Sequence, residues 1–108
     1  MIAWEDFERV EMRVGTVLEV KDFPEARRPA YQLKIDFGKY GVKNSSAQIT
    51  GWKKEELLGS QVIAVTNFPS KQIGSFFSEC LVLGIVQDEK CISLLRSDRK
   101  VQNGLKIA

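Results

Sequence analysis

The chain contains no histidine among its 108 residues. This absence removes the commonest general base and the commonest metal ligand among side chains. It also excludes a Ser–His or Cys–His nucleophile assembled within one chain. Walker-type and dinucleotide-binding glycine motifs are missing as well, and the acidic residues are scattered, with Glu55 and Glu56 beside lysines on an expected solvated helix face. We therefore expect neither an enzymatic activity nor a metal or cofactor.

Cysteine is nearly as scarce, with Cys80 and Cys91 inside apolar, strand-like runs and no CxxC motif. This spacing supports neither a redox motif nor a zinc site, and buried free thiols are the favoured interpretation. No apolar run approaches the roughly 20 residues of a membrane-spanning helix. Residues 1–6 lack the basic start and apolar stretch of a secretory signal, so we expect a cytoplasmic location, which in turn disfavours a disulfide.

A large excess of charge is also missing. The net charge of +2 is too small to indicate nucleic-acid binding from bulk electrostatics. Two local basic clusters, Arg27–Arg28 and the group of Arg96, Arg99 and Lys100, are more simply interpreted as solvated turns than as phosphate sites. The length, with 44% apolar and 28% charged residues, is typical of a single folded domain spanning residues 1–108.

What is present is a series of alternating apolar segments typical of β-strands. The first covers residues 10–20, where Val14, Leu18 and the other even-numbered positions share one face. Gly15 in its middle predicts a bend or bulge. Both faces of residues 80–86 are apolar, which predicts a central strand. The remaining strands are expected at residues 31–37, 42–49, 61–66 and 91–95.

Short elements fill the connections. A helical turn is expected at residues 4–7, and a short helix at residues 53–58 with Thr50 as its cap and Gly59 as its stop. Residues 87–90 predict a hairpin turn, and the partly apolar, extended tail at residues 101–107 needs a surface to cover it. This order predicts an all-β, five-stranded Greek-key barrel of the oligonucleotide/oligosaccharide-binding (OB) kind, with the helix between its third and fourth strands.

Two stretches are candidate ligand sites. Residues 67–79 connect two strands, yet they carry Phe68, Ile73 and Phe76 where connections are normally short and polar. They predict a loop that plugs one end of the barrel, or a half-apolar surface for an extended ligand, or both through different side chains. Residues 44–48 are small and polar, which is typical either of a blunted edge strand or of a ligand floor.

Several separated motifs resemble the CsaA-type export-related chaperones. They are residues 7–17 (FERVEMRVGTV), 28–31 (RPAY), 45–50 (SSAQIT), 67–69 (NFP), 71–74 (KQIG) and 78–79 (SE), so the resemblance runs from about Trp4 to Ile107. Ser70, Ser75 and Gln102 depart from the pattern, because proline is common there in the family, and this predicts a softer loop. The family shares its barrel with tRNA-binding domains such as the one appended to bacterial methionyl-tRNA synthetase.

The resemblance implies a homodimer that binds unfolded or export-bound polypeptide without ATP and has a link to the preprotein translocation ATPase SecA. In this hypothesis a client meets both polar and apolar side chains of the barrel. The expected contacts are Ser45, Ser46, Gln48, Asn67, Phe68, Lys71, Ile73, Phe76, Ser78 and Glu79. The terminal extensions are expected to form the dimer interface across a two-fold axis through Trp4, Phe7, Val101, Asn103, Leu105 and Ile107.

The competing hypothesis is a protein that recognises the shape of tRNA through the same groove. Arg13, Lys34 and Lys71 would then contact phosphates, and aromatic side chains would stack on bases. Arg13 and Lys34 alternate away from the apolar face of their expected strands, as this hypothesis requires. The low net charge and the interleaved acids Glu11 and Glu79 disfavour it.

Overall fold

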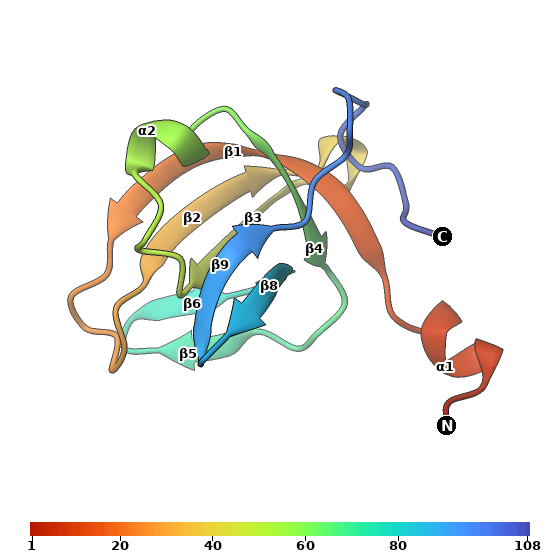
Figure 1. Cartoon of the computed structure of the whole chain (residues 1–108), viewed down its shortest axis with the longest axis horizontal. Helices are drawn as coiled ribbons and strands as arrows, with labels where there is room; N and C mark the ends of the chain where they lie inside the picture. Colours follow the sequence, from red (N-terminus) through yellow and green to blue (C-terminus); the bar gives the residue numbers. More distant parts are fainter.

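A nearly closed β-barrel with short helices at its periphery is the architecture of the chain, for which the computed structural model describes all 108 residues (Figure 1). The elements are α1 (Trp4–Glu8), β1 (Met12–Asp22), β2 (Tyr31–Asp36), the 3-10 turn η1 (Gly38–Tyr40), β3 (Val42–Ala47), α2 (Lys54–Leu57), β4 (Gln61–Val65), β5 (Lys71–Ile73), β6 (Phe76–Ser78), β7 (Leu81–Val82), β8 (Gly84–Gln87) and β9 (Lys90–Leu94). None of the helices has the length and apolar character needed to span a membrane.

The main sheet has five strands in the order β3-β2-β1-β4-β7, and all of its pairings are antiparallel. The run β3-β2-β1-β4 is a Greek key, in which the fourth strand returns to lie beside the first. Two hairpins, β5–β6 and β8–β9, complete the barrel wall. The expected five-stranded Greek-key barrel, with α2 between its third and fourth strands, is confirmed.

The core lies inside the barrel and draws on strands that are far apart in sequence. Val17 of β1, Ile35 of β2 and Val62 of β4 are each at most 1% exposed, as is Phe37 just after β2. Leu57 of α2 is fully buried as well, so this short helix contributes one apolar side chain to the core. Lys53 occupies the N-cap position of α2, where its N–H donates to Oε1 of Glu56 at 2.9 Å, and the expectation that Thr50 is the cap is wrong.

The alternation expected along the first strand is only partly correct. Val17 pairs in regular register with Ile35 and points into the core, and a β-bulge between Val17 and Glu19 then shifts the register of β1 against β2 and leaves Leu18 45% exposed. The expected position of Leu18 on the inner face is therefore wrong, and the irregularity falls after Gly15 rather than at it. Gly15 has a different role, because a Cβ there would lie 2.5 Å from Cγ2 of Ile35.

Two expectations about the second half of the chain are also wrong. Residues 67–79 are no loop but contain the β5–β6 hairpin, which turns at Gly74 with φ +61°. Residues 80–86 do not form one central strand. They divide into β7, at the edge of the main sheet, and β8, which pairs only with β9 and exposes Ile85 and Val86. Periodicity could not show this, because an apolar face looks the same in sequence whether another layer covers it or not.

The β8–β9 turn provides a test of backbone strain. Asp88 and Glu89 have φ values of 51° and 67°, a left-handed geometry that costs a side-chain-bearing residue roughly 1–2 kcal/mol. Hairpins with this turn favour Asn-Gly. We expect Glu89→Gly to raise the free energy of unfolding by about 0.5–1 kcal/mol, measured by urea denaturation, since part of the gain is offset by glycine's greater unfolded-state entropy. The control Gln87→Gly, in strand β8, should lower the free energy of unfolding. A loss of stability in Glu89→Gly would contradict the assigned turn.

Candidate functional site

The Ser45 side chain and the backbone of the two residues beside it hold the barrel closed along β3. The Oγ of Ser45, fully buried, donates to the carbonyl of Cys80 at 2.8 Å. The N–H of Ser46 donates to Oγ of Ser78 at 3.0 Å. Oε1 of Glu79 accepts from the N–H of Asn44 at 2.9 Å, and the Glu79 N–H donates to the Asn44 carbonyl at 2.8 Å. These hydrogen bonds replace a regular ladder along the outer edge of β3, so the Ser45 hydroxyl and the backbone of Asn44 and Ser46 are bonded to residues 78–80 of the same chain.

This seam also explains the chemistry of Cys80. Burial raises the pKa of its thiol to about 11, because the thiolate would lose its hydration inside the barrel. A thiol with so high a pKa is a weak nucleophile at neutral pH. Cys80 is buried and Cys91 half-buried, and both thiols are free, as the sequence predicts.

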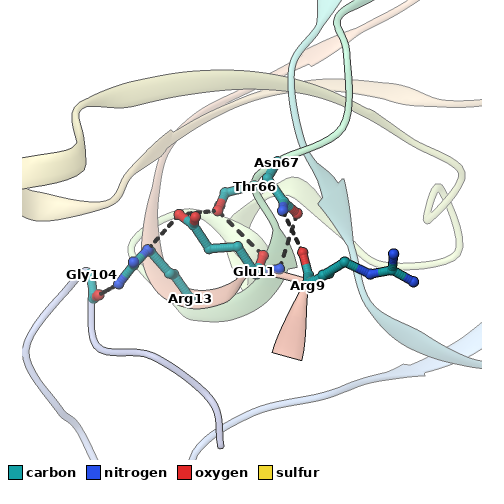
Figure 2. Close-up of polar contacts among 6 residues, drawn as sticks. All are labelled: Arg9, Glu11, Arg13, Thr66, Asn67 and Gly104. Carbon is teal, nitrogen blue, oxygen red and sulfur yellow. Dashed lines mark hydrogen bonds and ion pairs between the residues drawn. The ribbon is translucent and has the colours of Figure 1, made fainter. Parts of the chain in front are cut away.

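A second polar network joins the chain termini to the barrel (Figure 2). Oδ1 of Asn67 accepts from the N–H of Glu11 at 3.0 Å, while its Nδ2 donates to the carbonyl of Arg9 at 2.7 Å. Arg13 donates to Oε1 of Glu11 and to the carbonyl of Gly104, both at 2.8 Å. This hydrogen bond from Arg13, with a second from Thr66, holds the pKa of Glu11 below its usual value.

Arg13 is consequently not a solvent-exposed cation that is free to contact a ligand. Its side chain is 13% exposed, and its guanidinium carbon lies 3.6 Å from the centre of the Tyr40 ring. Both the oxygen and the nitrogen of the Asn67 side-chain amide are likewise hydrogen-bonded to backbone groups. The sequence pattern shows polar groups at these positions but not their partners. Glu11 lies 56 positions from Asn67, and Gly104 lies 91 positions from Arg13.

The remaining candidate contacts on and beside the β5–β6 hairpin differ in exposure. Phe68 is 55% exposed just before the β5–β6 hairpin, and Lys71 on β5 is exposed. Phe76 packs edge-to-face against the buried Phe23, with ring centres 5.2 Å apart. Ile73 is half-buried beside it on the same hairpin. Phe76 therefore covers the barrel, as one of the two interpretations expects, while Phe68 faces solvent and its contact with a ligand stays a prediction.

A hollow with other lining residues lies between the β1–β2 loop, the β3–α2 connection and the β8–β9 hairpin, and we call it the Trp52 groove. Its volume is about 1000 Å³. It is lined by the end of the β1–β2 loop, the β3–α2 connection, one residue of α2, and the β8–β9 turn. The lining residues are Arg28, Pro29, Gln48, Thr50, Gly51, Trp52, Glu56, Asp88, Glu89, Lys90, Cys91 and Ile92. Of the residues proposed from the sequence, Gln48 alone is among them.

The charges of the Trp52 groove are mixed. Arg28 and Lys90 face three acids, Glu56, Asp88 and Glu89. Trp52 supplies a large half-buried ring, and it is held in place from two sides. Its carbonyl accepts from the Tyr31 hydroxyl at 2.8 Å, and the Arg96 guanidinium lies 5.2 Å from its ring centre. A tryptophan in an otherwise polar connection was the signal in the sequence that could have located this groove.

The expected dimer residues divide into two groups. Val101 and Asn103 fix the tail to its own barrel, because Gln61 bonds both polar backbone atoms of Val101 and the Asn103 side chain accepts from Thr16 and Gln61. The tail then runs along the first half of β1, with the Leu105 carbonyl accepting from Val14. Apolar surface remains uncovered at Trp4 (82% exposed), Phe7 (36%) and Leu105 (48%), with Ile107 half-buried.

Comparison with known proteins places this barrel in a family. The family model described as "Putative tRNA binding domain" matches residues 12–106. The methionine–tRNA ligase of Pyrococcus horikoshii is 34% identical over 98% of the chain, which spans only 14% of that ligase, and the match is therefore to one part of an enzyme.

Solved structures extend the similarity to the whole chain. The CsaA chaperone protein of Picrophilus torridus is 52% identical, with a TM-score of 0.94 and complete coverage of both chains. The chaperone CsaA of Bacillus anthracis is 46% identical, with a TM-score of 0.93, and it covers 100% of this chain and 99% of its own. The two CsaA chaperones are similar to the chain over its full length, and the chain belongs to the putative tRNA binding domain family.

Proposed function

We propose that the protein is an ATP-independent chaperone that holds unfolded segments of other polypeptides in the Trp52 groove. The observation that carries this proposal is the mixed lining of the groove, in which the Trp52 ring and Ile92 lie among charges of both signs. Ligand sites of this type combine apolar surface with a few polar groups that fix orientation. An extended peptide offers both kinds of partner along its backbone and side chains.

The charge balance favours polypeptide over nucleic acid in this groove. Three carboxylates against two cations would repel a phosphate backbone, which binds chiefly through an excess of Lys and Arg. The same acids attract basic segments, so we expect a preference for clients that alternate basic and apolar residues. We also include the exposed Phe68 and Lys71, which lie before and on strand β5, in the proposed binding surface.

The assembly we propose is a homodimer with one groove in each protomer. Two linked grooves raise the avidity for a client long enough to reach both. Cooperation with the translocation ATPase SecA in protein export, in the cytoplasm, is part of the same proposal and is supported by the similarity to CsaA chaperones.

A second candidate, tRNA binding, is favoured by the family match. Of the three cations considered for phosphate contacts, Lys34 and Lys71 are exposed, whereas Arg13 is taken up by Glu11 and Gly104. Lys34 lies 3.8 Å from a carboxylate oxygen of Glu19, an exposed pair that offers little resistance to a competing phosphate.

The groove proposal is tested by titrating a fluorescently labelled, permanently unfolded protein. We expect Ile92→Ser and Trp52→Ser to weaken binding by roughly tenfold or more, since buried aromatic and aliphatic anchors dominate such interfaces. Ile92 is 53% exposed, so its substitution tests the groove without disturbing the core. Leu58→Ser is the matched control, because Leu58 is 56% exposed but lies outside the groove lining.

The same titration separates the two functions. Apolar peptide capture should change little with salt and should persist in excess tRNA, whereas phosphate contacts weaken steeply as salt rises. Binding that tRNA abolishes, or that Ile92→Ser and Leu58→Ser reduce equally, would contradict polypeptide binding in the Trp52 groove.

A further inference from the structure

A second hollow lies beside the start of β4, and it differs from the Trp52 groove in volume and in lining. Its volume is about 380 Å³ and no apolar residue lines it. We call it the Arg96 hollow, and its lining residues are Thr16, Gly59, Gln61, Arg96, Ser97, Arg99 and Lys100. The basic cluster that reads as a solvated turn in the sequence thus forms one wall of a recess.

The floor of the Arg96 hollow has its donors already occupied. The Thr16 hydroxyl donates to Oδ1 of Asn103 at 2.8 Å, and Nε2 of Gln61 donates to the Val101 carbonyl at 2.6 Å. The N–H of Gly59 donates to the Val17 carbonyl at 2.8 Å. The donors left for a ligand therefore belong to the side chains of residues 96–100.

These side chains concentrate positive charge. Arg96 and Lys100 have no ion-pair partner, and Arg99 shares the exposed carboxylate of Asp98 at 3.2 Å. Three cations and one acid leave +2 in this segment, which equals the net charge of the entire chain, so the rest of the protein is neutral. Like charges gathered at one recess repel one another, and an anion bound between them relieves that repulsion.

The segment is anchored at both ends before any ligand arrives. Nη2 of Arg96 donates to Oγ of Ser60 at 3.3 Å, and the N–H of Val101 donates to Oε1 of Gln61 at 3.1 Å. Between them, the N–H of Arg99 donates to Oγ of Ser97 at 3.4 Å. Such anchoring lowers the entropy lost when side chains converge on a bound group.

We propose that the Arg96 hollow is a binding site for phosphate groups, separate from the polypeptide groove. Arginine matches phosphate oxygens with a planar fork of donors and lysine adds a mobile point charge, so two arginines and a lysine around a polar recess suit this anion. The phosphates come either from a free oligophosphate or from the backbone of RNA. This site goes beyond the proposed chaperone function and does not depend on it.

The test is a ¹⁵N-NMR titration with inorganic phosphate, tripolyphosphate and an unstructured RNA oligonucleotide. We expect saturable shifts of the backbone signals of residues 97–100. The Trp52 indole signal should move with them, because Arg96 lies over that ring. In Arg99→Gln/Lys100→Gln the affinity should fall at least tenfold. If RNA is the source, the slope of log affinity against log salt should fall by about 1.4, the loss of two single-strand phosphate contacts.

Lys21→Gln/Lys39→Gln is the matched control, since it removes the same charge from exposed positions that line neither hollow. Its affinity should stay within a factor of two of the unmodified protein. Shifts with tripolyphosphate alone identify a free anion as the ligand, and shifts with RNA as well identify the backbone. No saturable shift with any of the three, or equal weakening in both double variants, would overturn the phosphate site. The outcomes of this test are independent of the titration with labelled unfolded protein that tests the Trp52 groove.

Discussion

Replacing Gly15 by alanine is expected to lower the free energy of unfolding by about 1–3 kcal/mol, the usual range for an overpacked core. A Cβ at this position would lie 2.5 Å from Cγ2 of Ile35 and 2.8 Å from the Phe37 ring. Both neighbours are fully buried, so neither can move without disturbing the packing around it. Urea denaturation measures the change, and the midpoint should fall with little change in slope.

A second glycine, Gly51, provides the control for this experiment. Nothing lies within 4 Å of a Cβ built on Gly51, and its backbone is not left-handed. Gly51→Ala should therefore be neutral or stabilising by up to about 1 kcal/mol, through a smaller unfolded-state entropy. If Gly15→Ala were as stable as Gly51→Ala, the close approach of β1 to β2 at this position would be wrong.

The double substitution Leu105→Asp with Ile107→Asp is expected to convert the proposed homodimer into a monomer. Leu105 is 48% exposed on the tail, and α1 buries none of its residues although it carries Trp4 and Phe7. The two termini lie on the same side of the barrel (Figure 1). A helix of five residues is not stable in isolation, so contact with a second copy would account both for its order and for its uncovered aromatic rings.

Leu105 and Ile107 are already partly covered, so completing the burial of each contributes about 0.7–1.5 kcal/mol, half the value for a fully exposed side chain, and a two-fold interface counts every contact twice. Light scattering gives the mass directly. The control Leu18→Asp/Leu58→Asp places the same charges on residues that are 45% and 56% exposed and lie away from the termini. We expect this control to stay dimeric, with both variants keeping the circular dichroism of the folded barrel. A dimeric mass for the tail variant would refute the interface.

The outline of the fold follows from the sequence because strands and turns are encoded locally. Alternation of apolar residues locates β1 to β4 within a few positions, and Gly59 ends α2 where the pattern predicts. The family could also be identified from short motifs, since these recur in fixed order along the chain. Both inferences depend only on neighbours in sequence.

The site could not be predicted in the same way, because its hydrogen bonds join residues that are distant in sequence. The Ser45 hydroxyl looks available for a ligand until the barrel closes and brings the Cys80 carbonyl against it, and the Ser46 N–H meets Ser78 in the same way. The bulge at Leu18 likewise reflects the strain of bending one strand around a closed barrel, which periodicity does not record.

The sequence by itself determined the class of barrel, strands β1 to β4 and the family, but neither the β5–β6 hairpin nor the division of residues 80–86 into β7 and β8. Tertiary structure alone decided which polar groups remain free to bind. It directed Asn67 and Arg13 to the chain's own backbone, gathered mixed charges around Trp52, and gathered Arg96, Arg99 and Lys100 around a polar recess. The physical reason is that a polar side chain satisfies its hydrogen bonds with whatever closure brings near, and only groups left unpaired at the surface can receive a ligand.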